Sequence, residues 1–142
     1  MTLSLTSRLL RAIYAHGEAA YPDEGAGLLL GAYQDGNKRV TEILPVDNAR
    51  EAPARRNRYL LTPQDYLLGE QEAAQRGLAV LGVFHSHPDS PNRPSEFDRE
   101  WAMPWFSYVI TSVLQGKAHE SRSWLLREDR SAFEEETIEW TI

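Results

Sequence analysis

Apolar and polar positions along the chain follow helical spacing in some segments and extended spacing in others. A stripe of apolar residues at helical spacing predicts a helix over residues 3–20, capped by Ser4 or Thr6. Continuous apolar runs over residues 27–33 and 78–85 predict buried strands. Further strands are expected at residues 38–46, 59–62, 105–113, 123–127 and 133–140, and further helices at residues 63–76 and 95–103.

The order of these elements predicts a fold that mixes helices and strands. One helix is followed by three strands, a helix, a strand, a helix and three strands, which is typical of an α/β or α+β protein with a mixed sheet. A length of 142 residues is typical of one domain, so we expect residues 1–142 to form a single domain.

The composition excludes several kinds of site and partner. The chain has no cysteine, which excludes disulfide scaffolds, thiolate zinc fingers, iron–sulfur clusters and cysteine nucleophiles. The net charge of -6 argues against nucleic acid as the main partner. No apolar run approaches the roughly 18 residues of a membrane span, and no signal pattern opens the chain, so we expect a cytoplasmic protein without a membrane partner. A solvated edge strand is expected around the acids near the end of the chain, Asp129, Glu134, Glu135, Glu136 and Glu139.

Two histidines at the end of an apolar strand form a candidate metal site. His85 and His87 are two residues apart, so in a strand both side chains point to the same face and can converge on one ion. Catalytic zinc takes three protein ligands, typically histidine and carboxylate, and keeps a position open for water. Asp98, one turn into the next predicted helix, is the candidate third ligand. The run from Ser95 to Asp98 is also a capping box, and both interpretations can hold because the box would orient Asp98.

Glu24 is the candidate proton shuttle for such a site. It lies in the turn before the buried strand over residues 27–33, where small residues at positions 25, 26 and 27 let the backbone approach a neighbour closely. The alternative is an ordinary turn acid, and the spacing does not decide between the two. Of the other histidines, we expect His16 to be packed or half-exposed and His119 to be solvated.

Together these residues resemble the JAMM (MPN+) metalloprotease family. The pattern H-x-H-x7-S-x-x-D is complete from His85 to Asp98, and Glu24 stands in the expected setting upstream. The resemblance runs from the first helix through Tyr108 and is closest to the short stand-alone bacterial and archaeal members. It implies a single MPN/JAMM domain, a mixed sheet flanked by helices, related to the cytidine-deaminase-like architecture. Many relatives carry cysteine after the glutamate, where this chain has Gly25; this removes a thiol but no metal ligand.

The resemblance also implies a zinc-dependent peptidase. His85, His87 and Asp98 would hold Zn²⁺. Glu24 would act as general base, and the Ser95 hydroxyl would stabilise the oxyanion. The implied substrate bond is an isopeptide or peptide bond at the C-terminal tail of a ubiquitin-like or sulfur-carrier protein. Cleavage would detach a lysine conjugate, trim an extension or release one amino acid, and the sequence does not separate these.

Candidates for substrate binding are fewer and leave alternatives open. A loop that contains Arg55, Arg56 and Arg58, together with Arg50, could meet an acidic ubiquitin-like surface or could be a solvated loop. Trp101 could belong to a substrate wall, a dimer patch or the core, and the oligomeric state is open.

Two other function classes compete with the peptidase. A non-catalytic MPN scaffold module resembles the enzyme but lacks its metal ligands, which are all present here, so a zinc assay separates the two. A zinc-dependent nucleotide deaminase needs cysteine ligands, and this chain has none.

Overall fold

The computed structural model describes residues 2–48 and 59–142. The chain order of helices and strands is β1 (Thr2–Thr6), α1 (Ser7–Ala20), β2 (Ala26–Gln34), β3 (Asn37–Val46), α2 (Pro63–Gln75), β4 (Ala79–Pro88), α3 (Glu96–Trp101), β5 (Ser107–Leu114), β6 (Lys117–Leu126) and β7 (Phe133–Thr141). Among the described residues, no helix has the length and apolar character needed to cross a bilayer.

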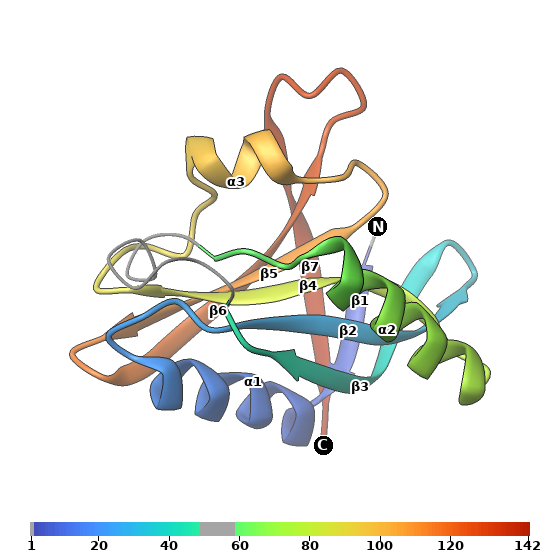
Figure 1. Cartoon of the computed structure of the whole chain (residues 1–142), viewed down its shortest axis with the longest axis horizontal. Helices are drawn as coiled ribbons and strands as arrows, with labels where there is room; N and C mark the ends of the chain where they lie inside the picture. Colours follow the sequence, from blue (N-terminus) through green and yellow to red (C-terminus); the bar gives the residue numbers. More distant parts are fainter. Residues whose placement is uncertain (1, 49–58) are drawn as a thin grey trace.

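The strands form one mixed sheet that closes on itself in the order β1-β3-β2-β4-β5-β6-β7. Three neighbouring pairs are parallel, namely β1 with β3, β1 with β7, and β4 with β5, and the others are antiparallel. The parallel pair β4 and β5 is joined by a crossover that contains α3 (Figure 1). This mixed sheet with helices packed on it confirms the predicted α/β (α+β) class.

Two hydrophobic cores form on the two faces of the central strands. Leu29 of β2 packs in one core with Leu9 and Ile13 of α1, whereas its neighbours Leu28 and Leu30 pack in the other core, with Ala73 of α2. This alternation is expected because successive side chains of a strand point to opposite faces of the sheet. The apolar run of β2 is therefore buried on both faces, as its uninterrupted hydrophobicity predicts.

The predicted first helix is wrong at its start. Residues 2–6 form β1, in which Leu3 and Leu5 are buried while their neighbours are partly exposed, a period of two that fits a strand. The helix begins after Thr6, whose side chain accepts a hydrogen bond from the backbone N–H of Leu9, so Thr6 is the cap and Ser4 is not. The apolar stripe therefore predicts the helix correctly over residues 7–20, and its predicted start is four residues too early.

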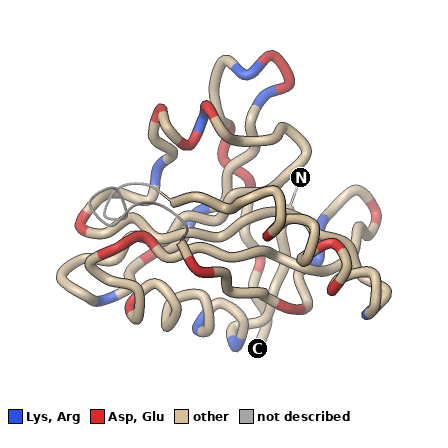
Figure 2. Tube along the Cα trace, in the orientation of Figure 1, with Lys and Arg blue, Asp and Glu red and all other residues tan. Residues whose placement is uncertain are grey.

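The position of β1 also corrects the prediction of an acidic edge strand. β7 lies between β1 and β6, so it has hydrogen-bonded neighbours on both sides. Glu136 consequently faces the interior, is 2% exposed and accepts a hydrogen bond from Ser123 Oγ at 2.8 Å. The other four acids of the group are exposed as predicted, and Figure 2 shows acidic and basic residues interspersed on the neighbouring turn between β6 and β7.

Several boundaries differ from the sequence prediction. The largest difference is in β6, which begins at Lys117 and not near residue 123, because Lys117 and Ala118 already pair with β5. Residues 59–62 are not a strand, although Tyr59 and Leu61 are buried. β4 continues past His85 to Pro88, because its last residues pair with β5, where His87 is opposite Ser112. α3 ends at Trp101, earlier than predicted, and Thr62 caps α2 as expected.

Candidate active site

A bulge in β4 decides which face carries the two histidines. Leu29 of β2 lies opposite Gly82 and Leu30 lies opposite Val80, so Leu81 is an extra residue without a partner. Beyond the bulge, His85 packs its ring on Tyr59, with centroids 4.4 Å apart. Ser86 points to the opposite face, where its Cβ lies 3.2 Å from the place that a Cβ on Gly17 of α1 would take. His85 and His87 therefore share a face, as their spacing predicts.

Asp98 lies beside both histidines and is oriented by the start of α3. Ser95 caps this helix, and its backbone N–H donates to Asp98 Oδ2 at 2.8 Å, while the Asp98 N–H donates to Ser95 Oγ at 3.1 Å. The same Oδ2 lies 3.2 Å from His87 Nε2, and Oδ1 lies 3.8 Å from His85 Nε2. The capping box and the proximity to the histidines thus coexist in one carboxylate.

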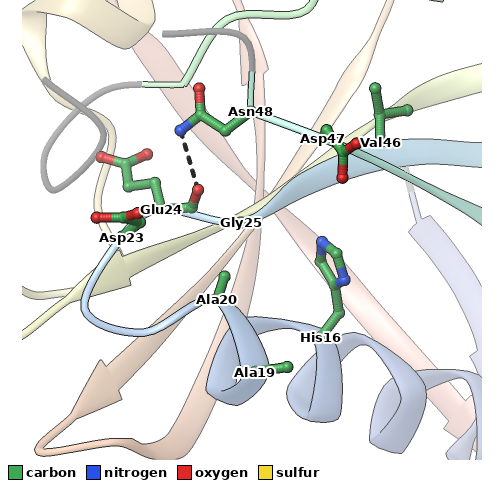
Figure 3. Close-up of a pocket in the computed structure, with 9 residues that line it drawn as sticks. All are labelled: His16, Ala19, Ala20, Asp23, Glu24, Gly25, Val46, Asp47 and Asn48. Carbon is green, nitrogen blue, oxygen red and sulfur yellow. Dashed lines mark hydrogen bonds between the residues drawn. The ribbon is translucent and has the colours of Figure 1, made fainter. Parts of the chain in front are cut away.

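Glu24 is held next to His85 by contacts of its neighbours. The N–H of Gly25 donates to Ser86 Oγ at 2.8 Å, and the N–H of Ser86 donates back to the Gly25 carbonyl at 3.0 Å. On the other side, Asn48 Nδ2 donates to the Glu24 carbonyl at 3.0 Å (Figure 3). Glu24 Oε1 lies 3.3 Å from His85 Nδ1, and the Glu24 residue is 4% exposed.

The buried polar atoms of this cluster fit a metal ion. One possible ligand atom from each of Glu24, His85 and His87 lies within 4.8 Å of the other two. Among the described residues, Glu24 Oε1 and both ring nitrogens of His85 have no hydrogen-bond partner although they are buried, which is costly unless another group binds them. Asp98 is not one of these three residues, although its Oδ2 lies 3.2 Å from His87 Nε2 and its Oδ1 lies 3.8 Å from His85 Nε2. The donor set of imidazole nitrogen and carboxylate oxygen is the one that zinc favours.

Neighbouring charges and hydrogen bonds shift the pKa values of Asp98 and His87. Burial by itself would raise the pKa of Asp98, but the charges of His85 and His87 and hydrogen bonds from His87 and the Ser95 backbone lower that pKa to about 2. Burial likewise opposes the charged form of His87, yet the hydrogen bond to Asp98 and the charges of Glu24 and Asp98 leave its pKa above the usual value. Asp98 is therefore an anion at neutral pH, ready to bind a cation.

Of the predicted substrate-binding residues, only Trp101 lies in the described part of the chain, and it is not one of the residues that converge at this cluster. Trp101 is 60% exposed and lines an apolar cavity of about 520 Å³ together with Tyr59 and Trp105. Arg55, Arg56 and Arg58, like Arg50, lie outside the described residues. The role of all of these in substrate binding stays a prediction.

Sequence reasoning missed three residues that shape the site. Tyr59 stacks on His85 from a segment far upstream, Ser86 ties β4 to the Glu24 turn, and the Pro91 carbonyl lies 2.8 Å from His87 Nδ1. Ser86 carried a signal, because a residue between two same-face histidines must point to the other face. Nothing in the hydrophobic pattern could have located Tyr59 or Pro91 beside the histidines.

Comparison with known proteins identifies the family of the chain. A family model described as prokaryotic homologs of the JAB domain matches residues 6–127. The chain belongs to this family. The predicted resemblance to the JAMM/MPN group is thereby confirmed, and with it the MPN fold of this JAB protein.

Individual relatives of this JAB protein cover most of its length. It is 31% identical over 127 residues to a desampylase of Pyrococcus furiosus, an alignment that covers 89% of this chain and 83% of the relative. It is 30% identical over 116 residues to a probable TtuB-protein conjugate cleaving protease of Thermus thermophilus, covering 80% of this chain and 74% of the relative. The solution structure of a Salinibacter ruber protein, at 44% identity, superposes with a TM-score of 0.76 and covers 95% of this chain and 89% of that one.

Proposed function

We propose that this JAB protein is a zinc-dependent metallopeptidase that hydrolyses an isopeptide or peptide bond at the C-terminal tail of a ubiquitin-like or sulfur-carrier protein. The observation that carries the proposal is the convergence of His85, His87 and Glu24, each of which places one possible ligand atom within 4.8 Å of the other two. Within the described residues, Glu24 Oε1 and both ring nitrogens of His85 have no hydrogen-bond partner. The names of the two relatives, a desampylase and a conjugate-cleaving protease, support the same bond class.

In this proposal His85, His87 and Asp98 hold the metal ion. Asp98 suits a ligand role because it is anionic and the Ser95 N–H fixes its orientation at 2.8 Å. The Glu24 carboxylate suits a base role because no residue in the described part of the chain forms a hydrogen bond with its Oε1, which so remains available to a proton. Bound zinc would supply a water molecule whose pKa is lowered toward about 7.

Glu24 and Ser95 perform the proton transfer and the charge stabilisation. Glu24 accepts a proton as the water oxygen attacks the carbonyl carbon, and delivers it to the leaving nitrogen when the C–N bond breaks. The Ser95 Oγ already accepts a hydrogen bond from the Asp98 N–H, so its own hydrogen remains free to be donated to the developing oxyanion. The products are a tail with a free carboxylate and a free amine.

The decisive experiment compares Glu24→Gln with a matched control. Zinc-loaded protein is incubated with the ubiquitin-like proteins of the source organism, as conjugates and as C-terminal extensions, and cleavage is followed by mass spectrometry with and without a chelator. We expect Glu24→Gln to keep one bound zinc by elemental analysis but to lose about 10²–10⁴-fold in turnover. Glu128→Gln, an exposed glutamate outside the site, should behave like the wild type.

Two results would contradict the proposal in different ways. Nearly full hydrolysis by Glu24→Gln would remove Glu24 from the role of base. A wild-type protein that binds no zinc would instead indicate a non-catalytic scaffold module.

A further inference from the structure

A second feature of the site is a cavity of about 290 Å³ on the side of His87. Its lining includes Glu24, His87, Ser95 and Arg93, so it opens directly beside the proposed reacting groups. This volume is at the lower end of the range for small-molecule sites, which suits one residue rather than a folded protein.

Arg93 contributes a positive charge to the lining of this cavity. Within the described parts of the chain, Arg93 is the only arginine or lysine that lines the cavity, and no hydrogen bond or ion pair engages its guanidinium. By contrast, Arg99 pairs with Glu96 at 2.7 Å and Arg130 donates to the Ala102 carbonyl at 2.8 Å. A free guanidinium beside a reaction centre is a ready binding group for a carboxylate.

The backbone on the N-terminal side of Arg93 is anchored by two hydrogen bonds. Asn92, its neighbour, donates from Nδ2 to the Glu120 carbonyl at 2.8 Å and accepts a hydrogen bond from Trp124 Nε1 at 3.0 Å. The loop is thus tied to β6, which limits the conformational entropy that a ligand of Arg93 would have to overcome.

Two other cavities near the site have no lysine or arginine among their described lining residues. The cavity of about 480 Å³ behind the Glu24 backbone is lined by His16, Asp23 and Asp47 and would repel a carboxylate (Figure 3). The apolar cavity of about 520 Å³ contains Trp101 and Trp105, and its lining among the described residues includes no lysine or arginine. Of these three cavities, as lined by the described residues, the Arg93 cavity is the one that combines a cation with access to the reacting groups.

We propose that this cavity binds the leaving side of the scissile bond as a residue with a free α-carboxylate, which Arg93 recognises. The inference rests on the proposed hydrolysis and names its preferred substrate: a tail that ends in one extra amino acid, rather than a tail joined to a lysine side chain. Hydrolysis adds the water oxygen to the tail, breaks the C–N bond and gives the leaving nitrogen its proton through Glu24. The product is a zwitterionic amino acid whose ammonium faces Glu24 and whose carboxylate faces Arg93.

The first test uses three synthetic peptides with the same sequence up to a Gly-Gly end. One continues to alanine with a free carboxylate, one to alanine carboxamide, and one is joined to the ε-amine of lysine. We expect zinc-loaded protein to cleave the free acid with kcat/KM about 10- to 100-fold above the carboxamide, the range for a hydrogen bond to a charged group. Arg93→Gln should slow only the free acid, and Arg11→Gln, an exposed arginine on α1, should change neither.

The outcomes separate this inference from the proposed function. Equal rates for acid and carboxamide, or an equal loss on both in Arg93→Gln, would overturn the Arg93 assignment and leave the hydrolase standing. Cleavage of none of the three peptides by zinc-loaded protein would count against the proposed function, and the Arg93 assignment would then be decided by binding.

The binding measurement uses the metal-free protein and needs no turnover. L-Alanine and L-alaninamide are titrated while the Arg93 Nε–Hε and Ser95 amide resonances are followed by NMR. We expect alanine to bind about tenfold or more tightly than alaninamide, and Arg93→Gln to abolish that difference. Equal affinities in the wild type would overturn the assignment.

Discussion

The two histidines of the site differ in their hydrogen bonds although they are two residues apart. His87 Nδ1 lies 2.8 Å from the Pro91 carbonyl, which can only accept, so this nitrogen carries the hydrogen and Nε2 points to Asp98. Neither nitrogen of His85 has such a partner within residues 2–48 and 59–142. At the residue scale, the tautomer of His87 is therefore defined by its hydrogen bond to Pro91, whereas both ring nitrogens of His85 lack a hydrogen-bond partner among the described residues.

The raised pKa of His87 predicts the pH dependence of zinc binding. Because Asp98 stabilises the imidazolium, His87 in the metal-free protein keeps its proton to a pH above its usual 6.5, and zinc must displace that proton. Below this raised pKa, the apparent zinc affinity should fall by about tenfold for each pH unit. A zinc-indicator competition between pH 5.5 and 8 measures this dependence.

The control for this profile is His119→Gln, which changes an exposed histidine on β6 and should leave the profile unaltered. A zinc affinity that stays constant below neutral pH would show that no proton is displaced from His87.

At the scale of elements, α3 is too short to be stable alone and is held by contacts at both ends. Its six residues begin at the Ser95 capping box, and an isolated helix of this length would not form in water. At its C-terminal end, the Arg130 guanidinium donates to the carbonyls of Arg99, Glu100 and Ala102 at 3.0, 3.1 and 2.8 Å. A cation at this end also matches the helix dipole. The position of Asp98 therefore depends on a turn between β6 and β7.

Removing the Arg130 side chain should weaken zinc binding without touching a ligand. Arg130→Ala takes away the contacts that hold α3, so we expect a loss of about 10- to 100-fold in zinc affinity, the usual cost of removing a group that orients a ligand. Faster hydrogen exchange of the α3 amides should accompany it. Arg127→Ala is the matched control, because Arg127 pairs with Glu134 and not with α3. Equal zinc affinity in the two variants would contradict this role of Arg130.

At the scale of the whole molecule, the site joins parts of the chain that are far apart in sequence. Glu24 lies between α1 and β2, the histidines lie on β4, and Asp98 lies on α3 in the crossover to β5. A ligand that binds these groups only in the folded state stabilises the whole fold.

Zinc removal should therefore lower the melting temperature. At a free zinc concentration 100 times its Kd, the free energy of unfolding should rise by about 2.7 kcal/mol, or roughly 6–10 °C for a chain of this size. Calorimetry with and without a chelator measures the shift. Glu24→Gln should keep the shift, whereas Asp98→Ala should lose it along with turnover; an undiminished shift in Asp98→Ala would exclude Asp98 as a ligand.

By itself the sequence determined the local features of this protein. The apolar run of β2, the Thr62 cap of α2, the same-face spacing of His85 and His87, and the capping box before Asp98 all follow from periodicities within a few residues. The motif that these residues form was sufficient to predict the family, because its spacing depends on the chain and not on tertiary contacts.

Only the tertiary structure decided the features that depend on distant partners. Residues 2–6 form a strand because β3 and β7 pair with them, and Glu136 is buried because β1 covers that side of β7. Tyr59 stacks on His85, and Arg93 lines the cavity beside Glu24, through contacts that no local pattern encodes. The physical reason is that strand pairing and cavity formation depend on which segments meet in space, whereas helical and extended periodicity depend on neighbours along the chain.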